Sequence, residues 1–352
     1  MKTSVKLLAA LLLIANFAFG QDITKQIDSI LLDNYKKNPN IGISVGFIKD
    51  NKEHYTAYGK LNAESQTPID KNAVFELASI TKILTSNLIA QAVVEHKIKI
   101  DDYIDNYLPK AYVLQNQIKG KIRISDLASH QSGLPDIDFA KLIAENPQQP
   151  VDNVNQETLA GIINNCTELA DYGKYRYSTI GYTLLGQILE NVYGKSYDEI
   201  VTLKMVKPLK LKNTLTKDFN VKNLTTAHNP EGGVQEFFKW NIMAAAGLIK
   251  SSSADMVTYL KAVLDEKSAF GKASILSEKT FYEDQKRALG LGLNIVGDDH
   301  NTLYMKSGDS MGQSTIICYN RAKNWGIIIL LDQRNSQMRN NLLNEINRIA
   351  LK

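Results

Sequence analysis

Ser79 and Lys82 lie three residues apart in the stretch ELASITKILTSNLI, residues 76–89. On a helix this spacing places the two side chains one turn apart on the same side. Burial lowers the pKa of a lysine because the ammonium form loses its hydration, and the neutral amine can then act as a base. Lys82 could therefore remove the proton from Ser79 and make the serine a nucleophile. The alternative is that the spacing arises by chance and that Lys82 extends to the solvent.

The expected position of Ser79 near the start of this helix also favours nucleophilic chemistry. Free backbone N–H groups and the positive end of the helix dipole stabilise a developing oxyanion. Apolar residues at Ile80, Ile83, Leu84 and Leu88 predict that the helix packs against a core. The stretch thus combines a buried helix with two polar groups that could react together.

Two later segments, YRYSTIGYTLLG (residues 175–186) and MKSGDSMG (residues 305–312), follow the first in order. With Ser79-Ile80-Thr81-Lys82 they resemble the Ser-x-x-Lys, Tyr-x-Asn and Lys-Thr-Gly motifs of the penicillin-recognising serine hydrolases. The tyrosine variant is most similar to class C β-lactamases, D-Ala-D-Ala carboxypeptidases and related esterases. Residues 124–136 and 244–256 are similar to framework segments of that family. The resemblance extends from about residue 22 to the end of the chain.

The resemblance implies a catalytic role for several residues. Ser79 would attack the substrate carbonyl and become acylated, with Lys82 beside it as base or proton relay. Tyr177 would place its phenol in the same proton network. Lys306 would add positive charge that lowers the pKa of Lys82 and can meet an anionic group of the substrate. The backbone N–H groups of Ser79 and Asp309 would form the oxyanion hole.

The second motif departs from the family pattern at its third residue. Thr179 stands where the family usually has asparagine, whose amide donates to the amide carbonyl of the substrate. The resemblance places Thr179, Ser307 and Gly308 at substrate-binding positions, so that the acylation machinery is intact while the group that reads a peptide-like acyl side chain is altered. This difference favours small esters or a non-standard D-amino-acid peptide over efficient β-lactam hydrolysis.

Two other features could suggest different chemistry. Residues 308–312 fit the Gly-x-Ser-x-Gly nucleophile elbow, which requires a helix after the serine and then an acid and a histidine. Residues 313–319 instead indicate a strand, and the last histidine, His300, precedes Ser310, so we do not expect Ser310 to be the nucleophile. The five histidines have no paired spacing with other metal ligands, so neither a metal nor a cofactor is expected. His130, in a framework segment, is expected to be structural.

Periodicity near both ends of the chain predicts helices and antiparallel strands. Residues 22–36 have a helical apolar stripe, residues 41–48 and 53–58 form a predicted hairpin, and strands are predicted at 302–306, 313–319 and 325–331, before a final helix that carries Leu342, Leu343, Ile346, Ile349 and Ala350. Residues 99–234 are helical and loop-rich, with helices predicted at 124–127, 158–163 and 181–193.

This order of elements predicts an α/β (α+β) fold. An antiparallel sheet flanked by helices is built from both termini, by residues 21–98 and 235–352, and holds an inserted all-α domain of residues 99–234. The resemblance implies the same β-lactamase/transpeptidase-like fold.

The first twenty residues have the pattern of a cleaved signal peptide. A basic start precedes an apolar run from Leu7 to Phe17 and small residues before Gln21. A retained membrane anchor is disfavoured because no cysteine offers a lipid site and polar sequence resumes at once. Cleavage leaves 352 − 20 = 332 residues and changes the formal charge from +4 to +2 by removing Lys2 and Lys6. A periplasmic or secreted protein is expected.

Composition limits the partners. No block of Lys and Arg remains that could follow a phosphate backbone, so nucleic acid is an unexpected partner. No membrane span is expected after cleavage of the signal peptide. We expect a monomer whose substrate is a small molecule or a peptidoglycan peptide. Cys166 and Cys318 are expected to be buried free thiols, since Cys318 lies in a strand-like apolar run.

Taken together, these features predict a secreted serine hydrolase that forms an acyl-enzyme. Its substrate class would be D-Ala-D-Ala-type peptides, β-lactams or small esters. The alternative is a penicillin-binding-like homologue that binds or is acylated without turnover, as a sensor or scaffold. The Ser79, Lys82 and Tyr177 set favours the enzyme, whereas Thr179 is the feature on which the binder interpretation rests.

Overall fold

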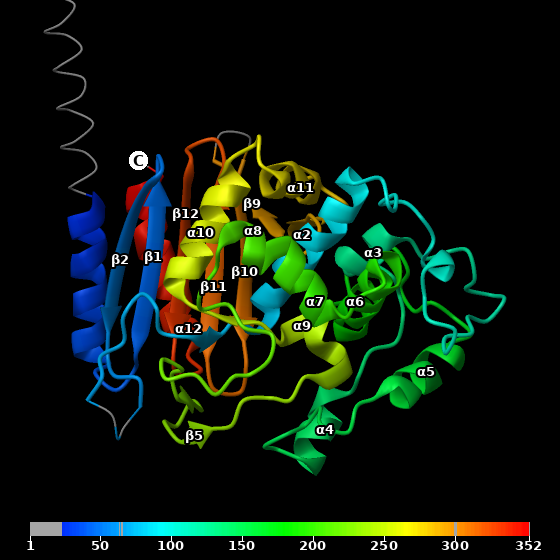
Figure 1. Cartoon of the computed structure of the whole chain (residues 1–352), viewed down its shortest axis with the longest axis horizontal. Coiled ribbons are helices and arrows are strands. Elements are labelled where there is room, and N and C mark those ends of the chain that lie inside the picture. Colours follow the sequence, from blue (N-terminus) through cyan, green and yellow to red (C-terminus); the bar gives the residue numbers. More distant parts are fainter. Residues whose placement is uncertain (1–22, 63, 65, 299–300, 352) are drawn as a thin grey trace, which may run out of the picture.

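The computed structural model describes residues 23–62, 64, 66–298 and 301–351. Its main feature is an antiparallel eight-stranded sheet with the order β2-β1-β12-β11-β10-β9-β8-β7 (Figure 1). The long strands are β1 (Ile43–Lys49), β2 (Lys52–Tyr58), β10 (Leu303–Asp309), β11 (Ser314–Asn320) and β12 (Trp325–Leu331). Because β1 pairs with β12, the two ends of the chain meet in the sheet. The predicted hairpin and the three late strands are confirmed.

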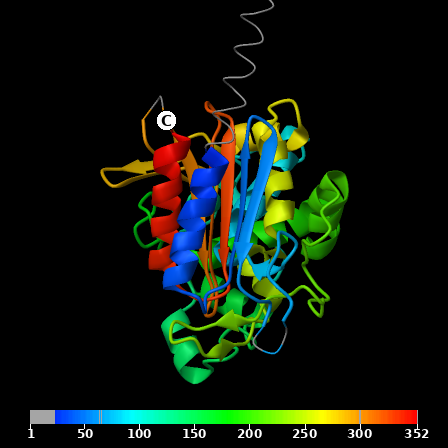
Figure 2. The ribbon, with the colours of Figure 1, turned by 90° about the vertical axis from the view of Figure 1, so that its left-hand side faces the viewer.

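Side chains alternate between the two faces of the central strands, as strand geometry requires. On one face, Val45 and Phe47 of β1 join Ile327 and Ile329 of β12 in a core with α12 (Ser336–Ala350) and the helix of residues 23–37. Figure 2 shows these two helices side by side on that face. The first and last predicted helices are thereby confirmed, and both cover the sheet.

The opposite face carries a second, larger core. Ile328 and Leu330 of β12 belong to it, together with α2 (Thr81–Val94), α10 (Ser253–Leu264) and α11 (Ala269–Ser277). Nearly every residue of α2 is buried, since the helix packs against α11 as well as α6 and α9. The helix is therefore enclosed on all sides, and the predicted apolar face is only part of its buried surface.

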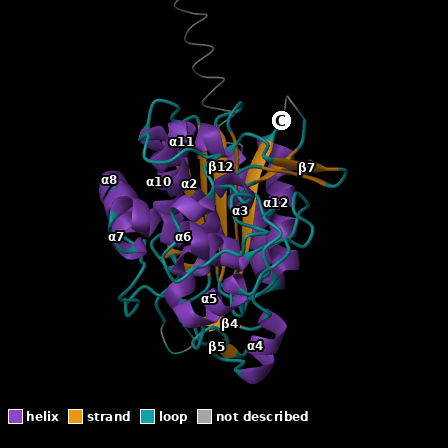
Figure 3. Ribbon diagram, turned by 90° about the vertical axis from the view of Figure 1, so that its right-hand side faces the viewer, coloured by secondary structure: helices purple, strands orange, loops and turns teal. Residues whose placement is uncertain are grey.

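The segment of residues 99–234 contains η2 (Ile104–Asn106), α3 (Ile124–Ala128), α4 (Phe139–Glu145), α5 (Gln156–Asn164), α6 (Thr179–Tyr193), α7 (Tyr197–Val201), η3 (Thr202–Val206) and α8 (Lys207–Leu209). Its helices α3, α5 and α6 lie on the side of α2 away from the sheet (Figure 1 and Figure 3). The end of the segment returns to the sheet-forming part of the chain, where Leu224 bridges to Val74 and His228 to Gln333. The three predicted helices correspond to α3, α5 and α6. The segment also contains β4 (Ala227–His228), which pairs with β5 (Val234–Gln235) at its boundary and is an exception to the all-α prediction.

Several short elements had no clear pattern in the sequence. They are β3 (Phe75–Glu76), η1 (Ala78–Ile80), η4 (Asn241–Met243), α9 (Ala244–Gly247), β6 (Lys250–Ser251), β7 (Tyr282–Asp284), β8 (Arg287–Leu289) and β9 (Asn294–Val296). Strands of two or three residues are too short for alternation to be visible. The hydrogen bonds to neighbouring strands decide their conformation instead.

Cys166 and Cys318 are both buried and free, as predicted. The predicted signal peptide, residues 1–20, lies outside the described residues. Within the described part of the chain, no helix has the length and apolar character needed to cross a membrane.

Candidate active site

Ser79 lies in η1, the short turn between β3 and α2. The residue before it, Ala78, has a φ of 46°, a left-handed conformation that is unfavourable for a residue with a Cβ atom. Anchors on both sides stabilise this turn: the Leu77 N–H donates to the Ile249 carbonyl at 2.9 Å, and the Ile80 N–H donates to the Leu77 carbonyl at 3.1 Å. Such strain is a feature of residues whose orientation matters for function.

The side chain of Ser79 is hydrogen-bonded to Tyr177, with 2.7 Å between the two hydroxyl oxygens. Tyr177 comes just before α6, whose N-cap residue Ser178 accepts the Gly181 N–H at 2.9 Å. The imidazole of buried His130 packs against the Tyr177 ring at 4.5 Å between centroids, and its Nδ1 accepts the Ser178 N–H at 3.2 Å. These contacts fix the phenol beside the serine.

Lys82 is almost completely buried on the first turn of α2 and is 1% exposed. Burial lowers the pKa of Lys82 to about 7, although Asp136 partly opposes the change. Its Nζ donates to the Ala246 carbonyl at 2.8 Å. No hydrogen bond joins Lys82 to Ser79 among the described residues, so the direct partner of the serine is Tyr177. A neutral amine donating to Ala246 still has a lone pair that can accept a proton.

Lys306 approaches Tyr177 from the sheet. Its Nζ is 4.8 Å from the centroid of the Tyr177 ring, and the Nζ of Lys82 is 5.0 Å from the same point. Burial lowers the pKa of Lys306, Tyr177 opposes that change, and Lys82 lowers it further. The low pKa of Lys82 is caused by burial, not by the charge of Lys306 that the sequence argument invoked. Two amines therefore flank one phenol.

Gly308 allows β10 to approach the turn that carries Ser79. A Cβ atom at this position would lie 2.2 Å from the Leu77 carbonyl oxygen and 3.1 Å from the backbone nitrogen of Ser79. Any larger residue would push the strand away. The backbone nitrogen of Ser79 thus faces the end of β10, where the next residue is Asp309, whose N–H is the second member of the predicted oxyanion hole.

The Asp309 side chain is held by a buried arginine that the sequence argument did not identify. Arg339, on α12, is 4% exposed, and its guanidinium contacts the Asp309 carboxylate at 2.6 Å. The Ser314 hydroxyl donates to the same carboxylate oxygen at 2.6 Å. Arg339 lies thirty residues from Asp309, and no sequence spacing indicates the pair.

A cavity of about 450 Å³ opens in front of Ser79. Its lining residues are Ser79, Lys82, Asp136, Ile137, Phe139, Ile143, Tyr177, Thr179, Phe238, Trp240, Asp309, Ser310, Met311 and Arg334. The structure therefore brings together five of the predicted site residues in one cavity: Ser79, Lys82, Tyr177, Thr179 and Asp309. Lys306, Ser307 and Gly308 lie on β10 and do not line it; Lys306 reaches the site through the Tyr177 ring.

Thr179 is the first residue of α6, and an acidic side chain caps this helix. Asp136 accepts the Thr179 N–H at 2.6 Å and the Ile180 N–H at 2.9 Å, one on each carboxylate oxygen. A carboxylate at a helix N-terminus satisfies free donors and complements the helix dipole. Asp136 ends the framework segment of residues 124–136, which was the only sequence signal for this role.

Ser310 also lines the cavity, but its hydroxyl is hydrogen-bonded within the turn that follows β10. Its hydroxyl accepts the N–H groups of Gly312 at 3.3 Å and Gln313 at 3.1 Å. The strand β11 follows instead of a helix. This is a β-turn between two strands and not a nucleophile elbow.

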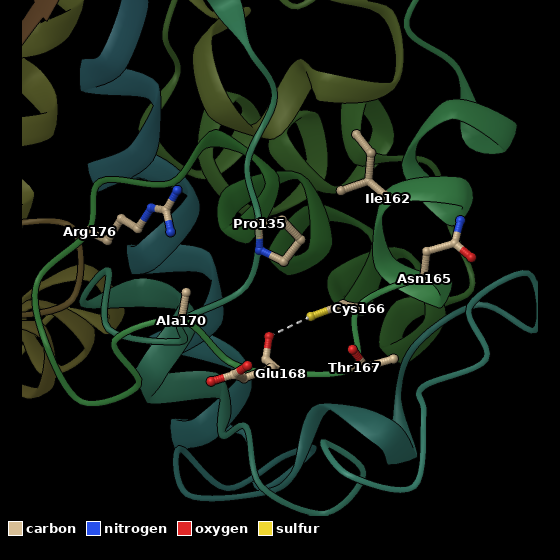
Figure 4. Close-up of a pocket in the computed structure, with 9 residues that line it drawn as sticks. Pro135, Ile162, Asn165, Cys166, Thr167, Glu168, Ala170 and Arg176 are labelled. Atoms are coloured by element: carbon tan, nitrogen blue, oxygen red, sulfur yellow. Dashed lines mark hydrogen bonds between the residues drawn. The ribbon is translucent and has the colours of Figure 1, made fainter.

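A separate cavity of about 350 Å³ lies near Cys166 (Figure 4). Arg176 and Glu168 line it, and the Cys166 thiol donates to the Glu168 carbonyl at 3.1 Å. Burial raises the pKa of Cys166, which makes the thiol less reactive. None of the predicted catalytic residues is among those that line this cavity, so we place the chemistry at Ser79.

The sheet, the enclosed Ser-x-x-Lys helix and the tyrosine beside it are the arrangement expected of the β-lactamase and penicillin-binding family. The family model described as Beta-lactamase matches residues 31–352, and the chain belongs to this family. The resemblance and the fold predicted from the sequence are thereby confirmed.

Individual relatives are distant. "Protein flp" of Staphylococcus aureus (strain MW2) is 25% identical over 321 residues, which cover 88% of this chain and 63% of that protein. Two solved structures have the same fold: a class C β-lactamase from Rhodobacter sphaeroides and a β-lactamase/D-alanine carboxypeptidase from Pseudomonas syringae. Each is 18% identical to this chain and superposes with a TM-score of 0.81. The match covers 93% of this chain and 99% of each of the other two chains. The chain thus spans less than two thirds of the length of the staphylococcal relative.

Proposed function

We propose that this chain is a secreted serine hydrolase that cleaves amide or ester bonds through an acyl-enzyme on Ser79. The observation that carries the proposal is the 2.7 Å contact between the Ser79 and Tyr177 hydroxyls, next to a buried Lys82 whose pKa is about 7. A serine with a phenol at hydrogen-bond distance and an amine that is partly neutral near pH 7 has a route for its proton.

In this scheme Ser79 Oγ bonds to the substrate carbonyl carbon while its proton passes into the Tyr177 and Lys82 network. The negative charge on the carbonyl oxygen is stabilised by the N–H groups of Ser79 and Asp309. The bond to the leaving group then breaks, and the same network returns the proton to that group. Water hydrolyses the ester on Ser79 in a second cycle and restores the serine.

The substrate class comprises D-Ala-D-Ala-type peptides, β-lactams and small esters. The name of the Pseudomonas syringae neighbour, a β-lactamase/D-alanine carboxypeptidase, supports the first two. Thr179 in place of an amide side chain supports esters, because an ester needs no donor to an amide carbonyl. We further propose that residues 1–20 are a cleaved signal peptide, that residues 99–234 form an inserted domain and that the mature protein is a periplasmic or secreted monomer.

A penicillin-binding homologue without turnover is the second candidate, and Thr179 is the observation that favours it. The decisive experiment measures turnover of a chromogenic cephalosporin, a p-nitrophenyl ester and a D-Ala-D-Ala peptide in parallel. Labelling with a fluorescent penicillin or a fluorophosphonate accompanies it. We expect at least one substrate to turn over, Ser79→Ala to abolish labelling and Ser310→Ala to retain it. Labelling without any turnover would favour the binder, and labelling of Ser79→Ala would exclude this nucleophile.

A further inference from the structure

One wall of the cavity in front of Ser79 is an apolar helix face that the rest of the protein covers only in part. Phe139 and Ile143 are four residues apart on α4 and lie on one side of that helix. Both line the cavity, yet α4 has no fully buried residue. Leaving two large apolar side chains at a water-filled cavity has a cost in free energy, which is recovered when an apolar group covers them.

Two aromatic side chains also line the cavity. Phe238 and Trp240 are each 8% exposed, and their ring centroids are 5.9 Å apart. Met311, from the turn between β10 and β11, adds an adaptable thioether to the lining. With Ile137, six apolar side chains surround the space in front of the nucleophile.

The two acids that line the cavity are already paired. Asp136 accepts a backbone N–H on each of its carboxylate oxygens. Asp309 is paired with Arg339 at 2.6 Å. The charge of Asp136 already acts on Lys82, and that of Asp309 on Arg339. An ammonium group on a substrate would therefore have to compete with these cations for compensation when it loses its hydration.

The charge at the edge of the cavity has the opposite sign. Arg334 is exposed and lines the cavity, and its guanidinium contacts the Met311 sulfur at 3.6 Å. A cation at the rim repels a positively charged acyl group and tolerates a neutral or anionic substrate. The charge of Arg334 and the apolar lining therefore both favour a neutral acyl group over one that carries an ammonium.

We infer that this active site takes esters or amides whose acyl group is neutral and apolar, of medium-chain alkyl or aryl type, and discriminates against acyl groups that carry an ammonium. The inference rests on the proposed acyl-enzyme function. An acyl group of this kind lies against α4 and the Phe238–Trp240 pair, while the leaving group takes the side of Tyr177, which returns its proton. Stem-peptide-like acyl groups with a free side-chain amine are poor substrates.

The test uses p-nitrophenyl esters, so that the leaving group is constant and only the acyl group changes. The acetate, the hexanoate and the 6-aminohexanoate are compared by kcat/KM at pH 7. We expect the hexanoate to exceed the acetate by about tenfold or more, since each buried methylene adds to transition-state binding. We expect the 6-aminohexanoate to fall at least about tenfold below the hexanoate, because its ammonium must compete with Lys82 and Arg339 for the carboxylates of the cavity.

Substitutions on α4 test whether this helix causes the preference for the hexanoate over the acetate. Phe139→Ser and Ile143→Ser should each reduce the hexanoate-to-acetate ratio of kcat/KM by about fivefold or more. Ile275→Ser is the matched control, because Ile275 is 39% exposed on α11 and does not line the cavity. Its ratio should equal that of the wild type.

The outcomes separate this inference from the proposed function. Hydrolysis that is lost in Ser79→Ala but is equally fast for all three esters retains the function and overturns the inference. A preference for the 6-aminohexanoate also overturns it. Absence of turnover and acylation with every ester, while the chromogenic cephalosporin or the D-Ala-D-Ala peptide is turned over, overturns the inference alone. Absence of turnover and acylation with all of these substrates overturns the proposed function, and the inference with it.

Discussion

The Nζ of Lys82 and the carbonyl oxygen of Ala246 are 2.8 Å apart, and the Lys82 side chain is only 1% exposed. The carbonyl accepts one amine hydrogen in either protonation state. Burial, which lowers the pKa of Lys82 to about 7, therefore leaves a fixed amine that is close to half neutral at physiological pH. The activity and the stability of the protein should both depend on this group.

The first prediction concerns the pH dependence of acylation. Lys82 accepts a proton only when it is neutral, so kcat/KM should rise with pH up to about 7 and then level off. Well below that value, the rate should fall about tenfold for each pH unit. The measurement is kcat/KM for p-nitrophenyl acetate between pH 5 and 9. Lys82→Ala should lose orders of magnitude in rate while remaining folded; near-normal acylation in that variant would transfer the role of base to Tyr177.

The same residue should reduce stability in a defined pH range. The pKa of Lys82 is about 7 in the folded protein and about 10.4 in an unfolded chain, so between these values the unfolded state binds more protons. The free energy of unfolding of the wild type should therefore increase with pH across this range, relative to Lys82→Met. Lys82→Met should be at least as stable as the wild type at pH 7, and its advantage should shrink towards pH 10. Urea unfolding at both pH values measures this; an advantage that grows with pH would contradict it.

The third prediction concerns Arg339, which is 2.6 Å from Asp309. Arg339→Met leaves the Asp309 carboxylate without its cationic partner, beside the proposed oxyanion hole. Since the Asp309 side chain is 31% exposed, water compensates in part, and we expect a loss of about 1–3 kcal/mol in the free energy of unfolding. We also expect kcat to fall about tenfold, with a smaller change in KM, because the N–H of Asp309 acts mainly in the transition state.

Arg348→Met is the matched control for Arg339. It makes the same change at an exposed position of the same helix, so neither the free energy of unfolding nor kcat should change. If Arg339→Met lowers stability but leaves kcat unchanged, the pair stabilises the fold without positioning the oxyanion hole.

The parts of this structure that could be predicted from the sequence are those with a local signal. The strands β11 and β12 contain apolar runs, β1 is mostly apolar, and the spacing of Ser79 and Lys82 falls within one helical turn. The strands β7, β8 and β9 pair with neighbours that are close in the chain, but they have only three residues each, too few for an alternating pattern to be visible in the sequence. They were missed for that reason.

In the candidate site, too, the residues with a local sequence signal could be predicted and the others could not. Tyr177 and Lys306 were found through motifs, but the contacts that hold the site come from elsewhere. Asp136 caps α6 from forty-three residues away, and Arg339 reaches Asp309 from α12. Charged residues of this kind resemble ordinary surface residues in a sequence, because their partners are brought close only by the fold. The apolar cavity wall from α4 was likewise invisible, since its periodicity is that of any short amphipathic helix.

The last prediction concerns Thr179, which lines the cavity at the start of α6. The Thr179 N–H is bound to Asp136, so Thr179→Asn keeps the helix cap and changes only the group that faces the substrate. An added amide donor should contribute about 0.5–1.5 kcal/mol towards a substrate amide carbonyl, or up to about tenfold in kcat/KM. We expect kcat/KM for β-lactams or D-Ala-D-Ala peptides to rise several-fold, whereas hydrolysis of p-nitrophenyl acetate, which lacks that carbonyl, should stay within about twofold. The ratio of the two changes is the measurement. An equal response of both substrates, or a poorer peptide-like substrate, would show that Thr179 does not occupy the substrate-reading position.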